Sequence, residues 1–335
     1  MANITQIAKT LGIAPSTVSR ALKKPSLVSL ETRRAVLQEA ERSGYIRKLQ
    51  TFANVSSSCS LVGVIVADLT NSFSNQIVKA VHDTLDSRGY SVIIGCSYEN
   101  SGSENRLLKQ WASLNLRGLI VMPSDKLSKS TSIYENIDMP VVFVDRESKA
   151  KDHDCVIEDN RFGISLATEH LTQLGHEKIC LISGNRKVFT FDERCQGAGD
   201  SYAPVEIMEL KADSYEELFV EAFEQTNILM LRPKGTRPTA VIGANNAITA
   251  GILYALSLKN FSIPKDISVL SYGDSNFCRY YPTPVTSICQ PIEEMGRVSA
   301  QLLLDRIEST QESSAKRICL KSMLMRRAST ASITT

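Results

Sequence analysis

The stretch that decides the fold lies near the start of the chain, where residues 4–22 read ITQIAKTLGIAPSTVSRAL. Apolar residues recur at helical spacing on both sides of Gly12, so we expect one helix over 4–11 and a second over 15–22. Gly12 suits the turn between them, because a left-handed backbone is not penalised there without a Cβ. Pro15 suits the first position of a helix, where no N–H is needed. With a third helix expected over 30–43, this is the plan of a helix-turn-helix domain.

The second helix of this unit is the one expected to enter the major groove of DNA. Ser16, Ser19 and Arg20 lie on its outward side, and the Arg20 guanidinium can donate two hydrogen bonds to guanine O6 and N7. Lys23, Arg33 and Arg34 are expected to hold phosphates. Residues 1–49 carry nine Lys/Arg and three Glu, a balance of +6 in a chain of net charge +2, so the remainder sums to −4. On charge alone, a phosphate-binding surface and a solvated face explain this basic segment equally well.

A polar, serine-rich stretch, RKLQTFANVSSSCS, follows over residues 47–60 and is typical of a linker. We therefore divide the chain into a helix-turn-helix head over 1–46, a hinge or linker over 47–60, and a body over 61–335.

The body alternates strand-like and helical segments in two successive series, which predicts an α/β fold with parallel, doubly wound sheets. The strand-like runs are LVGVIV (61–66), YSVIIG (90–95), GLIVM (118–122) and PVVFV (140–144), then KICLIS (178–183), PVEIMEL (204–210), TAVIGA (239–244) and ISVLS (267–271). A helix over 292–307 and a short strand near 318–324 end the pattern. We expect a first lobe over 61–159 and 290–317, and a second lobe over 160–289 and 318–330. A ligand should bind in the cleft where the carboxyl ends of the strands meet.

These motifs resemble the LacI family of bacterial transcription regulators over nearly the whole chain. In the head the resemblance rests on residues 4–45, above all on Thr17-Val-Ser-Arg20 and Gly44-Tyr45. In the body it rests on DLTNSF (68–73), VDR (144–146), NNAITAG (245–251) and IPKDIS (263–268). The resemblance implies a homodimer that binds double-stranded operator DNA, and two periplasmic-binding-protein-like lobes that hinge over a small effector, often a sugar or sugar phosphate. It leaves open whether the regulator is a repressor, which we expect, or an activator, and whether the effector is an inducer or a corepressor.

The resemblance also assigns DNA contacts residue by residue. Base-reading positions fall on Pro15, Ser16 and Arg20, and phosphate-positioning ones on Thr5, Thr17, Ser19 and Tyr45. The hinge departs from the family pattern, because Asn54 stands where relatives place an apolar side chain in the minor groove. Either Phe52 or Val55 takes that role, or the segment is a plain flexible linker. We place Phe52 among the expected DNA-binding residues.

Effector contacts follow in the same way. They are expected from Asn71, Phe73, Ser74, Asp145, Arg146, Arg194, Asn245 and Asp274. Asp274 is included because Gly273 occupies the position of the family's ligand-binding aspartate. Phe73 is as compatible with the core as with a sugar face, and Arg194 as compatible with a surface ion pair as with a ligand. The segment after Arg194, CQGAGDSYAPVE, is shorter than the corresponding segment of most family members. This is a further resemblance to the fructose and sucrose regulators of the family.

The sequence gives little support for other functions. None of the eight cysteines forms a CxxC pair, and none of the four histidines lies in an HExxH motif. We therefore expect neither a bound metal nor a cofactor. Without a GxGxxG after a strand or a P-loop, an enzyme is not expected. A transport binding protein would share the body but not the basic head. No apolar run approaches the ~20 residues that span a membrane, and the N-terminus does not look like a secretory signal, so a cytoplasmic location is expected.

Overall fold

The computed structural model describes residues 3–23, 27–43, 45, 60–124, 133–134, 137–147, 153–309 and 314–333. The chain divides into two compact units, residues 1–60 and 61–335. Among the described residues, no helix is both long and apolar enough to cross a membrane.

The first unit contains the three expected helices. They are α1 (Ile4–Leu11), α2 (Pro15–Lys23) and α3 (Leu30–Arg42). The Asn3 side chain accepts a hydrogen bond from the Gln6 N–H at 2.8 Å and caps α1. Gly12 ends α1 with φ 65°, which confirms the left-handed turn expected there. All three helices contribute apolar side chains to one small core: Ile7, Ala8, Val18, Ala21, Val36 and Ala40.

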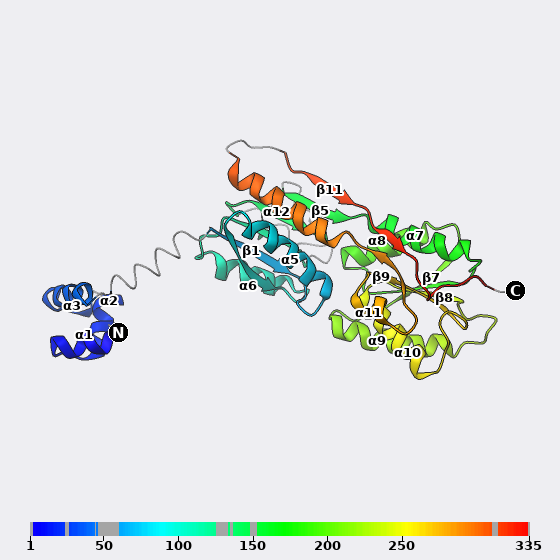
Figure 1. The fold of residues 1–335 in the computed structure, drawn as a ribbon, viewed down its shortest axis with the longest axis horizontal. Coiled ribbons are helices and arrows are strands. Elements are labelled where there is room, and N and C mark those ends of the chain that lie inside the picture. The colour runs from blue at the N-terminus through cyan, green and yellow to red at the C-terminus, as the bar shows by residue number, and fades with distance from the viewer. Residues whose placement is uncertain are drawn as a thin grey trace. The chain divides into compact units, whose positions relative to one another are not determined.

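The second unit is built on two six-stranded sheets, each covered by helices (Figure 1). The first sheet has the strand order β11-β5-β4-β3-β1-β2, and the second β12-β10-β9-β8-β6-β7. All neighbouring pairs whose register is described are parallel except β10 with β12. We call the part built on the first sheet the first lobe, and the part built on the second sheet the second lobe.

The strands of the first lobe are β1 (Ser60–Val66), β2 (Tyr90–Cys96), β3 (Gly118–Val121), β4 (Val141–Val144), β5 (Asp154–Glu158) and β11 (Arg317–Leu320). Its helices are α5 (Ser72–Asp86), α6 (Ser101–Trp111) and α12 (Ile292–Glu308). Strands β3 and β4 are apolar and buried along their whole length, because helices cover both faces of a parallel sheet. Helix α12 packs against α5 although about 200 residues separate them in the chain (Figure 1).

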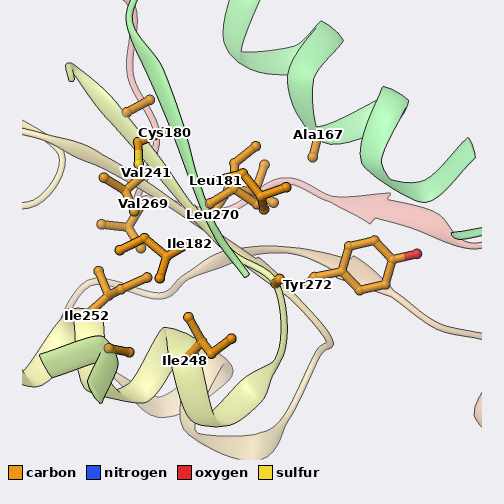
Figure 2. Close-up of a cluster of buried hydrophobic side chains, with 14 of the residues drawn as sticks. Ala167, Cys180, Leu181, Ile182, Val241, Ile248, Ile252, Val269, Leu270 and Tyr272 are labelled. Carbon is orange, nitrogen blue, oxygen red and sulfur yellow. The ribbon is translucent and has the colours of Figure 1, made fainter. Parts of the chain in front are cut away.

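The strands of the second lobe are β6 (Ile179–Ser183), β7 (Val205–Glu209), β8 (Ala240–Gly243), β9 (Ser268–Tyr272), β10 (Thr286–Cys289) and β12 (Met323–Met325). Its helices are α7 (Asn160–Gln173), α8 (Phe189–Gly199), α9 (Tyr215–Met230), α10 (Asn246–Leu258) and α11 (Asn276–Tyr280). Aliphatic side chains of β6, β8 and β9 pack with those of α10 in one core (Figure 2). Tyr272 lies at the edge of this core, with its hydroxyl directed away from the aliphatic side chains.

The chain passes between the lobes three times, at β5 to α7, at β10 to α12, and at β11 to β12. The third passage corrects an expectation. The single strand expected near 318–324 is two strands, since residues 317–320 pair with β5 in the first sheet and residues 323–325 with β10 in the second. The division expected between residues 317 and 318 therefore falls inside β11, and the chain leaves the first lobe after Leu320.

Candidate DNA-reading face and effector cavity

The outward side of α2 carries the residues expected to read bases. Pro15, Ser16 and Arg20 are exposed, whereas Val18 and Ala21 are buried in the core of the first unit. Residues three or four apart share one side of a helix, so α2 has an apolar side that fixes it and a polar side that is free. The helix can therefore present Arg20 without losing its packing.

The other residues expected to contact DNA are placed as follows. Thr5 and Arg33 are exposed, and Thr17 and Ser19 are partly buried. Tyr45 packs against the core of the first unit, so its ring has a structural role whatever its hydroxyl contacts. Phe52 and the rest of the linker up to residue 59 lie outside the described residues, as does the Lys23 side chain, whereas Ser60, expected in the linker, begins β1.

A cavity of about 80 Å³ lies between the two lobes, with walls from both of them. Several of the lining residues lie at the carboxyl ends of strands: Ala67 after β1, Met122 after β3, Asp145 after β4 and Tyr272 at the end of β9. This is where ligands bind in open α/β sheets. Seven of the residues expected to contact an effector line the cavity: Asn71, Phe73, Ser74, Asp145, Arg146, Arg194 and Asn245.

An ion pair forms one wall of the cavity. Arg146 donates two hydrogen bonds to the Glu99 carboxylate, each 2.6 Å long. Tyr98, Glu99 and Asp145 have φ values of 52°, 54° and 71°, a left-handed conformation that is uncommon for residues other than glycine. Burial raises the pKa of Asp145 to about 6, although the nearby Arg146 partly opposes this. Strained backbone and a perturbed carboxyl gather at functional sites more often than elsewhere.

Arg194 projects from α8 into the opposite wall and is held from several sides. Its Nε donates to Asn160 Oδ1 at 2.8 Å and its Nη1 to the Ala244 carbonyl at 2.7 Å. The guanidinium also lies 3.9 Å from the centre of the Tyr272 ring, as in a cation–π contact. Since Arg194 is only 5% exposed, it does not form a surface ion pair. Phe73, 7% exposed, belongs to the core of the first lobe and lines the cavity as well.

The buried carboxylate of Glu158 joins the cavity to all three passages between the lobes. Glu158 ends β5 at the first passage, and it accepts hydrogen bonds from Gln290 Nε2 at 2.6 Å and from the Ser322 hydroxyl. Gln290 and Ser322 belong to the second and third passages. On the cavity side, the Tyr272 hydroxyl donates to Glu158 at 2.7 Å, and Arg194 Nη2 lies 3.7 Å away.

Asp274 does not join the effector cavity. It accepts hydrogen bonds from Arg327, Arg279 and the Ser287 hydroxyl. Burial alone would raise the pKa of Asp274, but these hydrogen bonds lower it below its ordinary value. The reason for its position is Gly273, whose φ of 107° turns the chain away from the cavity before Asp274 is reached. The effector contact expected from Asp274 therefore does not fit this geometry.

Residues of the cavity and of the interlobe passages that the sequence reasoning missed include Glu99, Glu158, Asn246 and Gln290. Glu99 follows the carboxyl end of β2, so the position of that strand could have indicated it. Glu158 and Gln290 are held by partners from distant segments, and Asn246 Oδ1 has no hydrogen-bond partner among the described residues.

Known proteins share both units. Residues 3–48 match the bacterial regulatory proteins of the lacI family, and residues 168–330 match the periplasmic binding protein-like domain. The transcriptional repressor PurR of Vibrio cholerae serotype O1 is 27% identical over 320 residues, which is 93% of each chain. PurR of Actinobacillus pleuropneumoniae is 29% identical over 312 residues, 92% of each chain.

Solved structures have the same fold at lower identity. A LacI family regulator from Enterococcus faecalis V583 with bound ribose gives a TM-score of 0.72 at 22% identity, over 82% of this chain and all of that one. The Lac repressor bound to ONPG gives 0.70 at 23% identity, over 98% of this chain and 99% of that one. The head and the two-lobed body therefore have the same arrangement along the chain as in relatives that match over nearly their full length. This chain thus carries the helix-turn-helix domain of the lacI family and a periplasmic binding protein-like body, the plan of the transcriptional repressors that it resembles over nearly its whole length.

Proposed function

We propose that the protein is a homodimeric repressor that binds a pseudo-palindromic operator, and that a small uncharged sugar held between the lobes controls its affinity for DNA. We also propose the division into head (1–46), linker (47–60) and two-lobed body as the functional division of the chain. The head reads DNA and the body senses the effector.

The DNA-binding part of this proposal is supported by the exposed side of α2. Arg20 is an exposed guanidinium on a short helix whose other side is buried, and Ser16 lies one turn before it on the same side. Arginine is the side chain best shaped to bind guanine in the major groove, with about 1–3 kcal/mol of discrimination for a bidentate pair. The exposed Arg33 and Thr5 would contact phosphates.

The charges of the residues that line the cavity favour an uncharged effector. Both arginines that line it already have carboxylate partners, Arg146 with Glu99 and Arg194 with Glu158. Asp68, Asp145 and Asp213 line the cavity as well. Among the described cavity residues, no cation is left for an anionic group, so a sugar phosphate would meet an excess of carboxylates. Hydroxyl groups suit these carboxylate acceptors.

Similar solved structures that contain a bound sugar support a sugar as the effector. One LacI family structure was solved with ribose and another, from Alkaliphilus metalliredigens, with D-xylulofuranose. Four aromatic side chains also line the cavity, Phe73, Phe191, Tyr215 and Tyr272, so a purine base is a second candidate class.

A thermal-shift series tests the effector. D-Ribose and D-xylulose are compared with their 5-phosphates and with hypoxanthine, each on the full chain. A ligand at 100 times its Kd stabilises the folded state by about 2.7 kcal/mol, which raises Tm measurably. We expect the free pentoses to raise Tm and the phosphates to have little effect. Greater stabilisation by ribose 5-phosphate would contradict the proposed effector class, and stabilisation by hypoxanthine alone would favour the purine class.

Selection from a randomised duplex pool tests the DNA-binding part. We expect two inverted half-sites, spaced by about one helical turn or a multiple of it. The selected duplex is then titrated with the ligand that stabilises the protein. A fall in affinity identifies an inducer and a rise identifies a corepressor, whereas recovery of random sequences would contradict the proposed function.

A further inference from the structure

Asn246, the first residue of α10, lines the cavity, and the described residues give its side-chain oxygen no hydrogen bond. The residue is 7% exposed. A buried acceptor left unpaired costs the free energy of removing it from water, so native structures satisfy nearly all such atoms. An unpaired amide in the wall of a ligand cavity therefore suggests that a ligand supplies the partner.

The amide lies on the bare backbone of Gly273. A Cβ built at position 273 would stand 2.6 Å from Asn246 Oδ1, 3.0 Å from Cγ and 3.1 Å from Nδ2. The glycine backbone is fixed, because its N–H donates to the Ile288 carbonyl at 2.9 Å and its carbonyl accepts from the Ser271 hydroxyl at 2.9 Å. Any side chain at position 273 would displace the amide. The absence of a side chain at Gly273 thus leaves room for the Asn246 amide in its observed position, and Asn246 lines the cavity.

The neighbouring amide complements it. Asn245 Oδ1 caps α10 by accepting from the Ile248 N–H at 2.8 Å, so only its Nδ2 is left to donate to a ligand. Asn246 retains an acceptor. A hydroxyl group both donates and accepts, so one hydroxyl or two adjacent ones match this pair of amides.

We propose that Asn246 is a specificity-determining residue of the effector cavity, and that its amide accepts a hydrogen bond from an uncharged hydroxyl or N–H group of the effector. The inference rests on the proposed function, because it requires that the cavity binds an effector. The amide turns about the Cβ–Cγ bond, which has a broad torsional minimum, to meet the ligand.

The test compares Asn246→Ala and Asn246→Asp with the wild-type full chain. D-Ribose and D-xylulose are the probes, and both the Tm of the free protein and the affinity for each probe are measured. Asn227→Ala is the matched control, since Asn227 Oδ1 is also buried and unpaired but the residue does not line the cavity.

We expect Asn246→Ala to bind the pentose about tenfold more weakly, because a ligand donor is left unpaired in the cavity. Its Tm without ligand should equal or exceed that of the wild type, since the described residues form no hydrogen bond with the Oδ1 that is removed. Asn246→Asp keeps an acceptor at a helix N-terminus that tolerates negative charge, so it should bind more tightly than Asn246→Ala. The Asn227→Ala control should bind as the wild type does.

Two results would overturn the inference. One is wild-type affinity in Asn246→Ala, and the other is a fall of several degrees in its ligand-free Tm, which would assign the amide a structural role. If neither pentose binds the wild type, the proposed effector class is wrong. In that case a ligand-free Asn246→Ala at least as stable as the wild type still supports a ligand role for Asn246, and a destabilised one still overturns it.

Discussion

Asp145 combines two unfavourable features at one position. Its backbone is left-handed, with φ of 71°, and its carboxyl is buried beside the cavity with a pKa of about 6. Burial is the main cause, since removing a carboxylate from water penalises its charged form. Such a residue lowers the stability of the fold and is retained where function requires it.

Asp145→Asn should remove this penalty in a pH-dependent way. The pKa of Asp145 rises on folding from its ordinary value of 3.8 to about 6, so its contribution to stability is complete below pH 4 and is lost as the pH rises through 6. Asparagine stays neutral and tolerates positive φ. The variant should therefore gain on the order of 3 kcal/mol relative to the wild type between pH 4 and pH 7. Urea denaturation across this range measures the difference, and parallel pH profiles for the two proteins would contradict the expectation.

Arg20→Ala should change sequence preference rather than stability. Arg20 is exposed on α2, so its removal leaves the core of the head intact. A lost bidentate contact to guanine costs about 1–3 kcal/mol at one base pair and relaxes the preference there. Arg33→Ala is the control, because a lost phosphate contact weakens binding to all sequences about equally. Competition binding with duplexes substituted at single positions separates the two, and an unchanged preference in Arg20→Ala would exclude α2 as the reading helix.

At the scale of elements, β5 ends at a buried carboxylate on which the three interlobe passages converge. Glu158 is 1% exposed, and its hydrogen-bond donors come from Gln290, Ser322 and Tyr272. No one of these segments can move far without breaking a hydrogen bond to Glu158. The lobes and the cavity are thus coupled through one side chain.

Glu158→Ala should destabilise the body by about 3–5 kcal/mol, since three hydrogen-bond donors would lose their acceptor and the buried Arg194 guanidinium its ion-pair partner. Glu158→Gln should cost much less, because a rotated Gln290 amide can still pair with it. Trp111, the only tryptophan in the chain, is 7% exposed in the first lobe and reports unfolding by fluorescence. Equal losses in the two variants would show that the charge, and not the hydrogen bonds, determines the stability.

Elements with a continuous apolar pattern could be predicted from the sequence, and those held by distant polar partners could not. The run LVGVIV over 61–66 lies within β1, whose residues from Val62 onward are buried. In contrast β5 was missed, because it begins and ends with the acids Asp154 and Glu158. Their burial depends on groups far along the chain, such as Arg306, which donates to Asp154 at 2.7 Å. Helix α8 was missed too, since it contains two glycines and has no side-chain cap.

The same distinction applies to the candidate site. Asn71 and Phe73 could be placed at the cavity because they follow a strand of obvious pattern. Asp274 could not, because the turn at Gly273 that removes it from the cavity depends on backbone conformation and on the distant Arg327. Asn246 is informative only once its lack of a partner is known.

At the scale of the whole molecule, the net positive charge is concentrated in a small unit with its own core. A head of this size makes few base contacts, and two heads held together by their bodies gain from a high effective concentration. Residues 1–58 alone should therefore bind an operator about 100-fold more weakly than the full chain. Gel-shift titrations on the same duplex measure this. Equal affinities would mean that the body contributes nothing to DNA binding.

The three passages between the lobes also bear on how the protein is made. Strands β6 to β10 are complete by residue 289, so most of the second sheet is available before the last helix emerges from the ribosome. The first sheet begins earlier but receives its covering helix α12 and its edge strand β11 only from residues 292–320. Although domains generally fold in order from the N-terminus, the lobe that is translated first must wait for nearly the whole nascent chain before it can close.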